Sequence, residues 1–215
     1  MIKRKILDSY YDNETKNLIL NKATELFALK GFSSVTMRDI AKVVGIKMSS
    51  IYYYYESKEA LLKDVLTRFE TGYRNYFDWL TDINAQANSL DELMDNMFNR
   101  EFIEMRDPIN CLSMSLVVKE QHSHESVRKL FFDLFIDFSI KRLKADFDRL
   151  IDKGLIPKSD TQNLAEIFIF CVIAANDVRI HDYAGIKPPI DYIEFYSGLK
   201  KMLTTALMTP RENLQ

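Results

Sequence analysis

Four consecutive tyrosines, at positions 52–55, are the side chains of this sequence best suited to bind another molecule. Neighbouring residues of a helix point about 100° apart, so four in a row cannot all be buried in one helix. Some of their hydroxyl groups must face solvent or a partner, and phosphate oxygens are natural acceptors for them. Lys47, Ser49 and Ser50 come just before the run and extend the same polar surface. The pattern indicates contact with a phosphate-bearing molecule.

The residue types that usually perform catalysis or bind metals occur without the partners they would need. His122 and His124 flank Ser123, but no carboxylate pair or cysteine accompanies them at metal-ligand spacing. No Ser/His/Asp constellation and no glycine-rich phosphate loop is present. Cys111 and Cys171 form no disulfide framework and are expected to be reduced, buried thiols of a cytoplasmic protein. We therefore expect no enzyme activity, no cofactor and no metal.

The elements that must position the tyrosines are helices. One helix face is predicted before Gly31, from apolar residues that recur at helical spacing: Ile19, Ala23, Leu26 and Phe27. Thr36 is the expected N-cap of a second helix, Gly45 the following turn, and 47–54 a short third helix. Residues 36–55 thus have the order of a helix-turn-helix, whose second helix enters the DNA major groove. A plain three-helix bundle without DNA contacts is the alternative.

The rest of the chain also reads as helices, about nine in all, with no convincing strand. Ser57 is expected to open a fourth helix that ends near Leu80, and Ser89 with Glu92 forms a capping box for the next. Further helices are predicted from Pro108, from Ser123 through Leu150, from Ser159 or Asp160 to Tyr183, and from Pro188-Pro189 to Met208. Only six glycines and five prolines in 215 residues favour this all-α class.

Composition and charge narrow the class further. An apolar content of 47% excludes a mainly disordered chain. The longest apolar run, nine residues at 167–175, is too short to span a membrane, which needs about 20. Net charge is −2, but residues 1–60 carry ten Lys/Arg against seven Asp/Glu, while the remainder carries nineteen against twenty-four. A basic N-terminal part on an acidic remainder fits an N-terminal part that binds a polyanion. We expect no membrane insertion.

From Thr15 to about Leu66 the chain resembles the TetR family of bacterial transcriptional regulators. The family pattern is an apolar-Ala-Phe helix, Gly-aromatic, Thr-x-x-x-Ile-Ala, Gly-apolar, a short helix with Tyr and further aromatics, and then Ser-Lys-x-x-Leu. All of these parts stand in order between Ile19 and Leu62. The resemblance implies a three-helix DNA-binding head, here residues 13–73, and a C-terminal regulatory and dimerisation domain, residues 74–215.

The resemblance also implies which side chains bind DNA. Thr36, Tyr52 and Lys58 match phosphate-binding positions of the family. The exposed recognition-helix positions correspond to Lys47, Met48, Ser49, Ser50 and Tyr53. Met48 and Ser49 replace a frequent Lys and Gly, so the operator of a relative cannot be transferred to this chain.

In the family, the C-terminal region usually binds a small ligand and dimerises. Candidate pocket residues are apolar side chains with one polar group, namely Met94, Met97, Phe98, Phe102, Met114, Phe131, Phe135, Phe138 and Asp177. The run at 167–175 is apolar on every side, which predicts two buried faces, one of them at a dimer interface. The interface candidates are Phe168, Phe170, Ile173, Tyr196, Leu199 and Leu203. Ordinary core packing is the alternative for each of these residues.

We expect a homodimeric repressor that leaves an inverted-repeat operator when a small, largely apolar effector binds. One alternative is a DNA-binding protein of the same type without a ligand, either an activator or a chromosome-organising factor. A helical enzyme or lipid-binding module is a third possibility, which a failure to bind DNA would favour.

Overall fold

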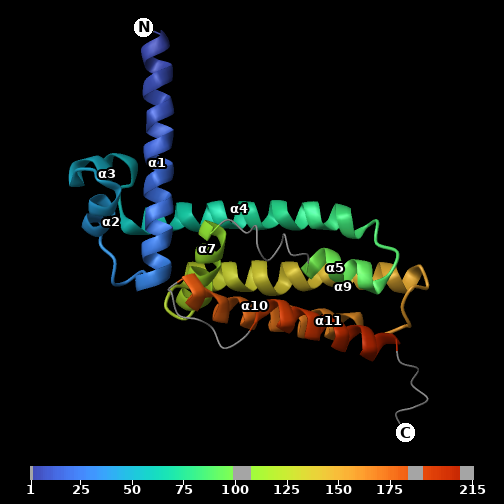
Figure 1. Ribbon diagram of the computed structural model, residues 1–215. Coiled ribbons are helices and arrows are strands. Elements are labelled where there is room, and N and C mark those ends of the chain that lie inside the picture. The colour runs from blue at the N-terminus through green and yellow to red at the C-terminus, as the bar shows by residue number, and fades with distance from the viewer. Residues whose placement is uncertain (1, 99–107, 184–190, 209–215) are drawn as a thin grey trace. The chain divides into compact units, whose positions relative to one another are not determined.

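A computed structural model describes the backbone of residues 2–98, 108–183 and 191–208, and the side chains of residues 14–98, 109–175, 191 and 194–207 (Figure 1). These parts are helical and contain no strand, which confirms the all-α class. The helices are α1 (Ile2–Lys30), α2 (Met37–Val44), α3 (Met48–Tyr54), α4 (Lys58–Asn84), α5 (Leu90–Phe98), α7 (Pro108–Glu120), α8 (Glu125–Leu130), the π-helix η1 (Phe131–Phe138), α9 (Ser139–Asp152), α10 (Thr161–Tyr183) and α11 (Tyr192–Met208). Because α8, η1 and α9 are continuous, the described residues form nine helical stretches. None of the described helices is long and apolar enough to cross a membrane.

The chain divides into two compact units. Residues 1–72 and 107–130 form one, which we call the head unit; residues 73–106 and 131–215 form the other, the body unit. We expected the head at 13–73, and the head unit differs in that it also includes residues 1–12 and the segment that carries α7 and α8. The reason is that α7 packs along α1, a pairing of distant segments that local patterns do not reveal.

In α1, the predicted apolar face is buried and the expected stop is present. Gly31 has φ 84°, a left-handed conformation that glycine adopts without strain, and its N–H bonds to the carbonyl of Phe27 at 2.9 Å. The ring of Phe32 then folds back onto Phe27, with the ring centroids 5.1 Å apart. The helix begins as early as Ile2, well before the segment that resembles a DNA-binding head.

Both α2 and α3 form where the sequence predicts them. The side chain of Thr36 caps α2, and Gly45, with φ 80°, donates its N–H to Ala41 and ends it. The buried face of α2 is apolar and consists of Met37, Ile40 and Ala41. Figure 1 shows α2 and α3 together on one side of α1.

The fourth helix is longer than expected, because contacts within the body unit stabilise its C-terminal end. As predicted, Ser57 caps the start of α4 by accepting the N–H of Ala60 at 3.0 Å. The helix continues past Leu80 through a polar stretch to Asn84. There the amide of Asn84 donates to Asp146 at 2.7 Å, and Arg149 donates to the backbone carbonyl of Asn84 at 2.5 Å. The Arg149 bond satisfies an end carbonyl of the helix that would otherwise be left to water, and the side-chain bond to Asp146 holds this end in place.

The body unit has a continuous apolar core built from α4, α5, α9, α10 and α11.

The helix predicted from Ser123 through Leu150 begins in the head unit and continues in the body unit, and two of its details differ from the prediction. The helix expected from Ser123 begins at Glu125, with the carbonyl of His124 accepting the first helical bond from Arg128. Its middle part, η1, is a π-helix, and the hydroxyl of Ser139 donates to the carbonyl of Leu134 five residues earlier. No periodic pattern predicted that change of helix type.

Candidate nucleic-acid interface

The outward face of α3 follows from how little of this helix is buried. Ile51 is fully buried, and Tyr55 just beyond the helix is also buried. Because α3 has only seven residues, these two anchors leave most of its surface exposed. Tyr53 is 74% exposed and Tyr52 49% exposed. The other exposed candidates are Lys47, Met48 and Ser49, while Ser50 is half-buried.

Of the four tyrosines, two face outward and two face inward. Tyr54 is half-buried, with its ring 5.0 Å from that of Tyr53. The hydroxyl of Tyr55 donates to Asp64 on α4 at 3.2 Å, and Lys16 on α1 pairs with the same carboxylate at 3.0 Å. Burial, with the nearby Asp64 carboxylate, raises the pKa of Tyr55, which therefore stays a neutral donor. The last tyrosine thus fastens α3 to α4 and α1.

Thr36 stands at the start of α2 in a complete capping box. Its hydroxyl donates to Asp39 at 2.6 Å and accepts the Asp39 N–H at 3.2 Å, while the Thr36 N–H donates to the same carboxylate at 2.9 Å. These hydrogen bonds, first that from the Thr36 side chain, lower the pKa of Asp39. A phosphate at this helix end would therefore meet a hydroxyl already engaged and a nearby negative charge.

Lys58 reaches back from the start of α4 to the loop that precedes α2. Its ammonium donates to the carbonyls of Phe32 and Val35 at 2.8 and 2.9 Å and lies 4.2 Å from the centroid of the Phe32 ring. Two of its three N–H donors thus hold the loop and one is left. The side chain is half-buried.

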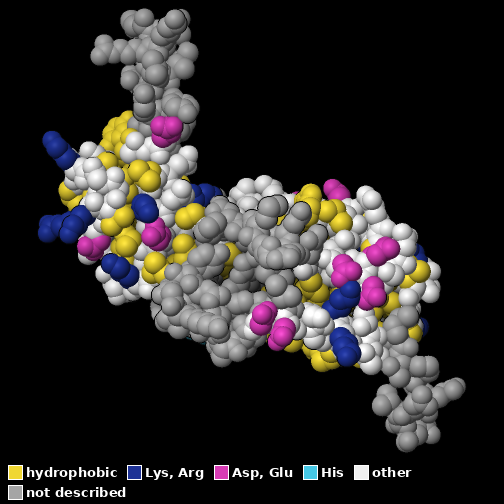
Figure 2. All heavy atoms as spheres, in the orientation of Figure 1, with side chains coloured by type: hydrophobic (Ala, Val, Ile, Leu, Met, Phe, Trp, Pro, Cys, Tyr) yellow, Lys and Arg dark blue, Asp and Glu magenta, His cyan; other side chains and the backbone are white. Residues whose placement is uncertain are grey.

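Two exposed cations of α2 were missed in the sequence analysis. Arg38 and Lys42 stand four residues apart and face away from the buried side of the helix. On the face shown in Figure 2, Lys and Arg side chains project from the part of the head unit that carries α2 and α3. Since the first helix of a helix-turn-helix crosses the DNA backbone, the polar positions opposite Ile40 could have identified both residues.

Most of the candidate pocket residues are packed in the interior of the structure. Those of the body unit are largely core residues: Met94, Met97, Phe131 and Phe135 are buried, and Phe98 and Phe138 are half-buried. Met114 is buried in the head unit instead. Phe102 lies outside the described residues, as does the side chain of Asp177. A cavity in the head unit is lined by none of these residues.

The dimer candidates also differ in their placement. Four of them are buried within their own body unit: Phe168, Tyr196, Leu199 and Leu203. Ile173 is half-buried, and Phe170 is 55% exposed. Ile167 on α10 and Met202 on α11 are exposed as well, although neither was among the interface candidates. The run at 167–175 therefore has an inner face in the core and an outer apolar face.

Comparison with known proteins decides what this head is. A sequence model of the family described as bacterial regulatory proteins, tetR family, matches residues 19–65. The chain belongs to the TetR family. As a TetR-family protein it is a DNA-binding transcriptional regulator, and the family consists of transcriptional regulators rather than enzymes. The resemblance stated from the sequence is confirmed.

Relatives of this TetR-family regulator extend the similarity beyond the head. The biofilm operon icaADBC HTH-type negative transcriptional regulator IcaR of Staphylococcus aureus (strain Newman) is 28% identical over 151 residues, which cover 63% of this chain and 77% of IcaR. The probable HTH-type transcriptional regulator YttP of Bacillus subtilis (strain 168) is 22% identical over 198 residues, 92% of this chain and 79% of YttP.

Solved structures share the fold of the TetR-family regulator at low sequence identity. A putative TetR-family regulator from Rhodococcus sp. superposes with a TM-score of 0.67 at 16% identity, over 91% of this chain and all of that one. A putative transcriptional regulator from Saccharomonospora viridis in complex with choline also has a TM-score of 0.67, at 20% identity, over 91% of this chain and 98% of that one.

Proposed function

We propose that the protein is a homodimeric repressor that binds an inverted-repeat operator and leaves it when a small, largely apolar effector binds. The observation that carries the proposal is the seven-residue α3, anchored by Ile51 and exposing Met48, Tyr52 and Tyr53. A repressor role is supported by IcaR, which is named as a negative regulator. A small-molecule effector is supported by the similar structure that contains choline.

In this proposal the exposed residues of the head have separate roles. The recognition surface faces base edges and consists of Lys47, Met48, Ser49, Ser50 and Tyr53. Tyr52 and the remaining N–H donor of Lys58 bind phosphates, and Thr36 caps α2, the helix expected to cross the DNA backbone. Arg38 and Lys42 add two exposed cations for the phosphates.

The proposed dimer is supported by the outer apolar face of the body unit. Exposed apolar side chains there are Ile167 and Phe170 on α10 and Met202 on α11. Exposed apolar surface of this kind is stabilised when a partner covers it. Two copies that pair through the same surface are related by a two-fold axis. Two identical heads on such an axis need two related half-sites, which is why we expect an inverted repeat.

The proposed effector site is in the body unit, among the soft side chains Met94, Met97 and Phe98. These residues pack closely in the described structure. Methionine is unbranched and adapts readily to a new shape, so a ligand can enter by displacing side chains. The effector must prefer a conformation that the operator does not, because only differential affinity shifts the equilibrium.

Selection of bound sequences from random double-stranded DNA, followed by footprinting, tests the operator. An inverted repeat protected at two half-sites supports the proposal, and binding should weaken steeply with added salt. A single unsymmetrical half-site, or no bound sequence at all, contradicts it.

A ligand screen on the same complex tests the repressor switch. Trp79 is the only tryptophan and is exposed on α4, so its fluorescence reports on the body unit. An effector should change that fluorescence and release the operator at matching concentrations. Saturating binding of every hit with unchanged operator affinity would favour the ligand-independent alternative.

A further inference from the structure

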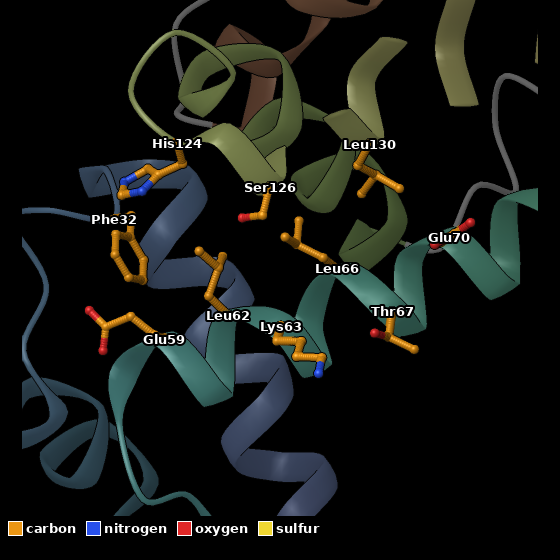
Figure 3. Close-up of a pocket in the computed structure, with 10 residues that line it drawn as sticks. All are labelled: Phe32, Glu59, Leu62, Lys63, Leu66, Thr67, Glu70, His124, Ser126 and Leu130. Atoms are coloured by element: carbon orange, nitrogen blue, oxygen red, sulfur yellow. The ribbon is translucent and has the colours of Figure 1, made fainter. Parts of the chain in front are cut away.

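A cleft of about 530 Å³ lies entirely within the head unit. One wall is the N-terminal half of α4, the opposite wall is α8, and Phe32 closes one end (Figure 3). The lining side chains are Phe32, Glu59, Leu62, Lys63, Leu66, Thr67, Glu70, His124, Ser126 and Leu130. None of them has a role in the proposed operator contacts or in the proposed effector site of the body unit.

The inner surface of the cleft is apolar and well ordered by packing. Leu62 and Leu66 are four residues apart on α4 and are buried on the side that faces α8. Leu130 and the ring of Phe32 complete this surface. A pocket of a few hundred Å³ with an apolar interior and a few polar groups at its edge is the usual form of a small-molecule site.

The charges around the cleft favour a positive ligand. Glu59 and Glu70 contribute two carboxylates and Lys63 one ammonium, so the lining has a net charge of −1 when His124 is neutral. Lys58 and Glu120 both bond to the backbone of Phe32, and their opposite charges cancel.

The carboxylate of Glu59 lies at the Phe32 end of the cleft, next to the Phe32 ring in Figure 3. It makes no hydrogen bond or ion pair with the described residues. On the other side of that ring, His124 lies 4.7 Å away edge-on, and its Nε2 is 3.6 Å from Oε2 of Glu120, beyond hydrogen-bond reach. Because the charges of Lys58 and Glu120 cancel, Glu59 is the carboxylate that a positive group would find at this end.

We propose that this cleft binds an amphipathic organic cation. Its apolar part lies on Leu62, Leu66 and Leu130, and its positive group lies at the Phe32 end beside Glu59. The site is distinct from the proposed effector site. It adjoins the loop held by Glu120, which accepts the Phe32 N–H at 2.8 Å, and by Lys58, which bonds to the Phe32 carbonyl.

The binding experiment uses the full-length protein without DNA, so its outcome is independent of the operator and the repressor switch. The probes are octyltrimethylammonium and octanesulfonate, two eight-carbon amphiphiles of opposite charge, followed by calorimetry and by the imidazole proton signals of His124. We expect one saturable site for the cation, with an affinity about tenfold higher than that of the anion, because opposite charges a few Å apart attract in a partly desolvated cleft. Equal affinities, or a cation that leaves the His124 signals unchanged, would overturn the proposal.

Two pairs of variants locate the site. Ser126→Trp places an indole in the cleft from an exposed position, and Ser123→Trp makes the same change at an exposed residue outside it. Ser126→Trp should abolish cation binding and Ser123→Trp should preserve it. Binding that survives Ser126→Trp in a folded protein, as judged by circular dichroism, would assign the cation to another site.

The second pair tests the charge. Glu59→Gln keeps the size of the side chain and removes its charge, while Glu56→Gln does the same at an exposed residue that does not line the cleft. We expect Glu59→Gln to weaken cation binding about three- to tenfold and to leave octanesulfonate no weaker. An equal effect of the two variants on the cation would show that Glu59 does not hold the positive group.

Discussion

The head and the body of this protein are built from the same kind of helix, yet they differ in how far their working surfaces can be recognised. In the head unit, α3 has seven residues and buries only Ile51, so most of the remaining side chains face outward. In the body unit, the run at 167–175 within α10 is apolar on all sides, and Phe168 belongs to the core while Phe170 is exposed. A short helix exposes whatever it cannot bury, whereas a long apolar helix does not reveal which face meets its own core and which a partner.

The largest expected effect separates the two faces of α10. Phe168→Ala removes a ring that is 2% exposed and lies 5.1 Å from that of Phe98. We expect it to lower the free energy of unfolding by about 3–5 kcal/mol, because the cavity adds to the lost burial. Urea unfolding, repeated at several protein concentrations, measures the change.

Phe170→Ala is the matched control on the outer face. It should cost the protomer less than about 1 kcal/mol, as surface substitutions generally do, and act on assembly instead. Phe170→Glu should give monomers in analytical ultracentrifugation. A stable dimer of Phe170→Glu would contradict the proposed interface, and a small effect of Phe168→Ala would contradict its core position.

A second prediction concerns the anchor of α3. Ile51→Ala should cost about 2–4 kcal/mol and weaken operator binding, although the replaced side chain touches no DNA. Without this anchor, the exposed residues of α3 lose the fixed positions that DNA recognition needs. Operator affinity and urea unfolding, measured together, check both effects.

The control for this prediction is Met48→Ala, at an exposed position of the same helix. It should leave the unfolding transition almost unchanged and alter which bases are preferred. If Ile51→Ala bound the operator as well as the wild type, the outward face of α3 would not be the recognition surface.

A smaller effect is expected for Lys58, whose ammonium has both a structural and a proposed DNA-binding role. Lys58→Met keeps the aliphatic stem but removes the bonds to Phe32 and Val35, which should cost about 1.5–3 kcal/mol. The lost phosphate contact should also reduce the slope of log affinity against log salt by about 0.9. Loss of stability with an unchanged slope would leave Lys58 only its structural role.

The smallest effects are those of two carboxylates with opposite pKa shifts. The Thr36 hydrogen bond lowers the pKa of Asp39 below 3.8, so its contribution to stability is present above pH 3.8 and disappears as the pH falls through the folded pKa. Burial raises the pKa of Asp146 above 3.8. The contribution of Asp146 to stability is therefore greatest below that pH and declines as the pH rises through the folded pKa.

Unfolding free energies between about pH 3 and pH 7 separate these two signs. Asp39→Asn should remove stability toward neutral pH and have little effect in acid. Asp146→Asn should remove the decline that ionisation of Asp146 causes as the pH rises. Parallel pH profiles for the two variants would contradict the assigned directions.

The sequence alone determined the helical class, the head and the outward side chains of α3. Apolar spacing predicted the buried face of α1, Thr36 and Gly45 predicted the ends of α2, and four adjacent tyrosines could not share one buried face. All of these depend on residues within a few turns of one another. Local rules of capping and periodicity are sufficient for them.

Only the tertiary structure decided what depends on residues far apart in the chain. It grouped α7 and α8 with the head, because α7 packs on α1, and extended α4 to Asn84 through bonds to Asp146 and Arg149. It also buried Leu199 and Leu203, which periodicity had made equally suited to an interface. An apolar residue indicates that another apolar surface covers it, but which surface does so depends on the packing of the whole chain.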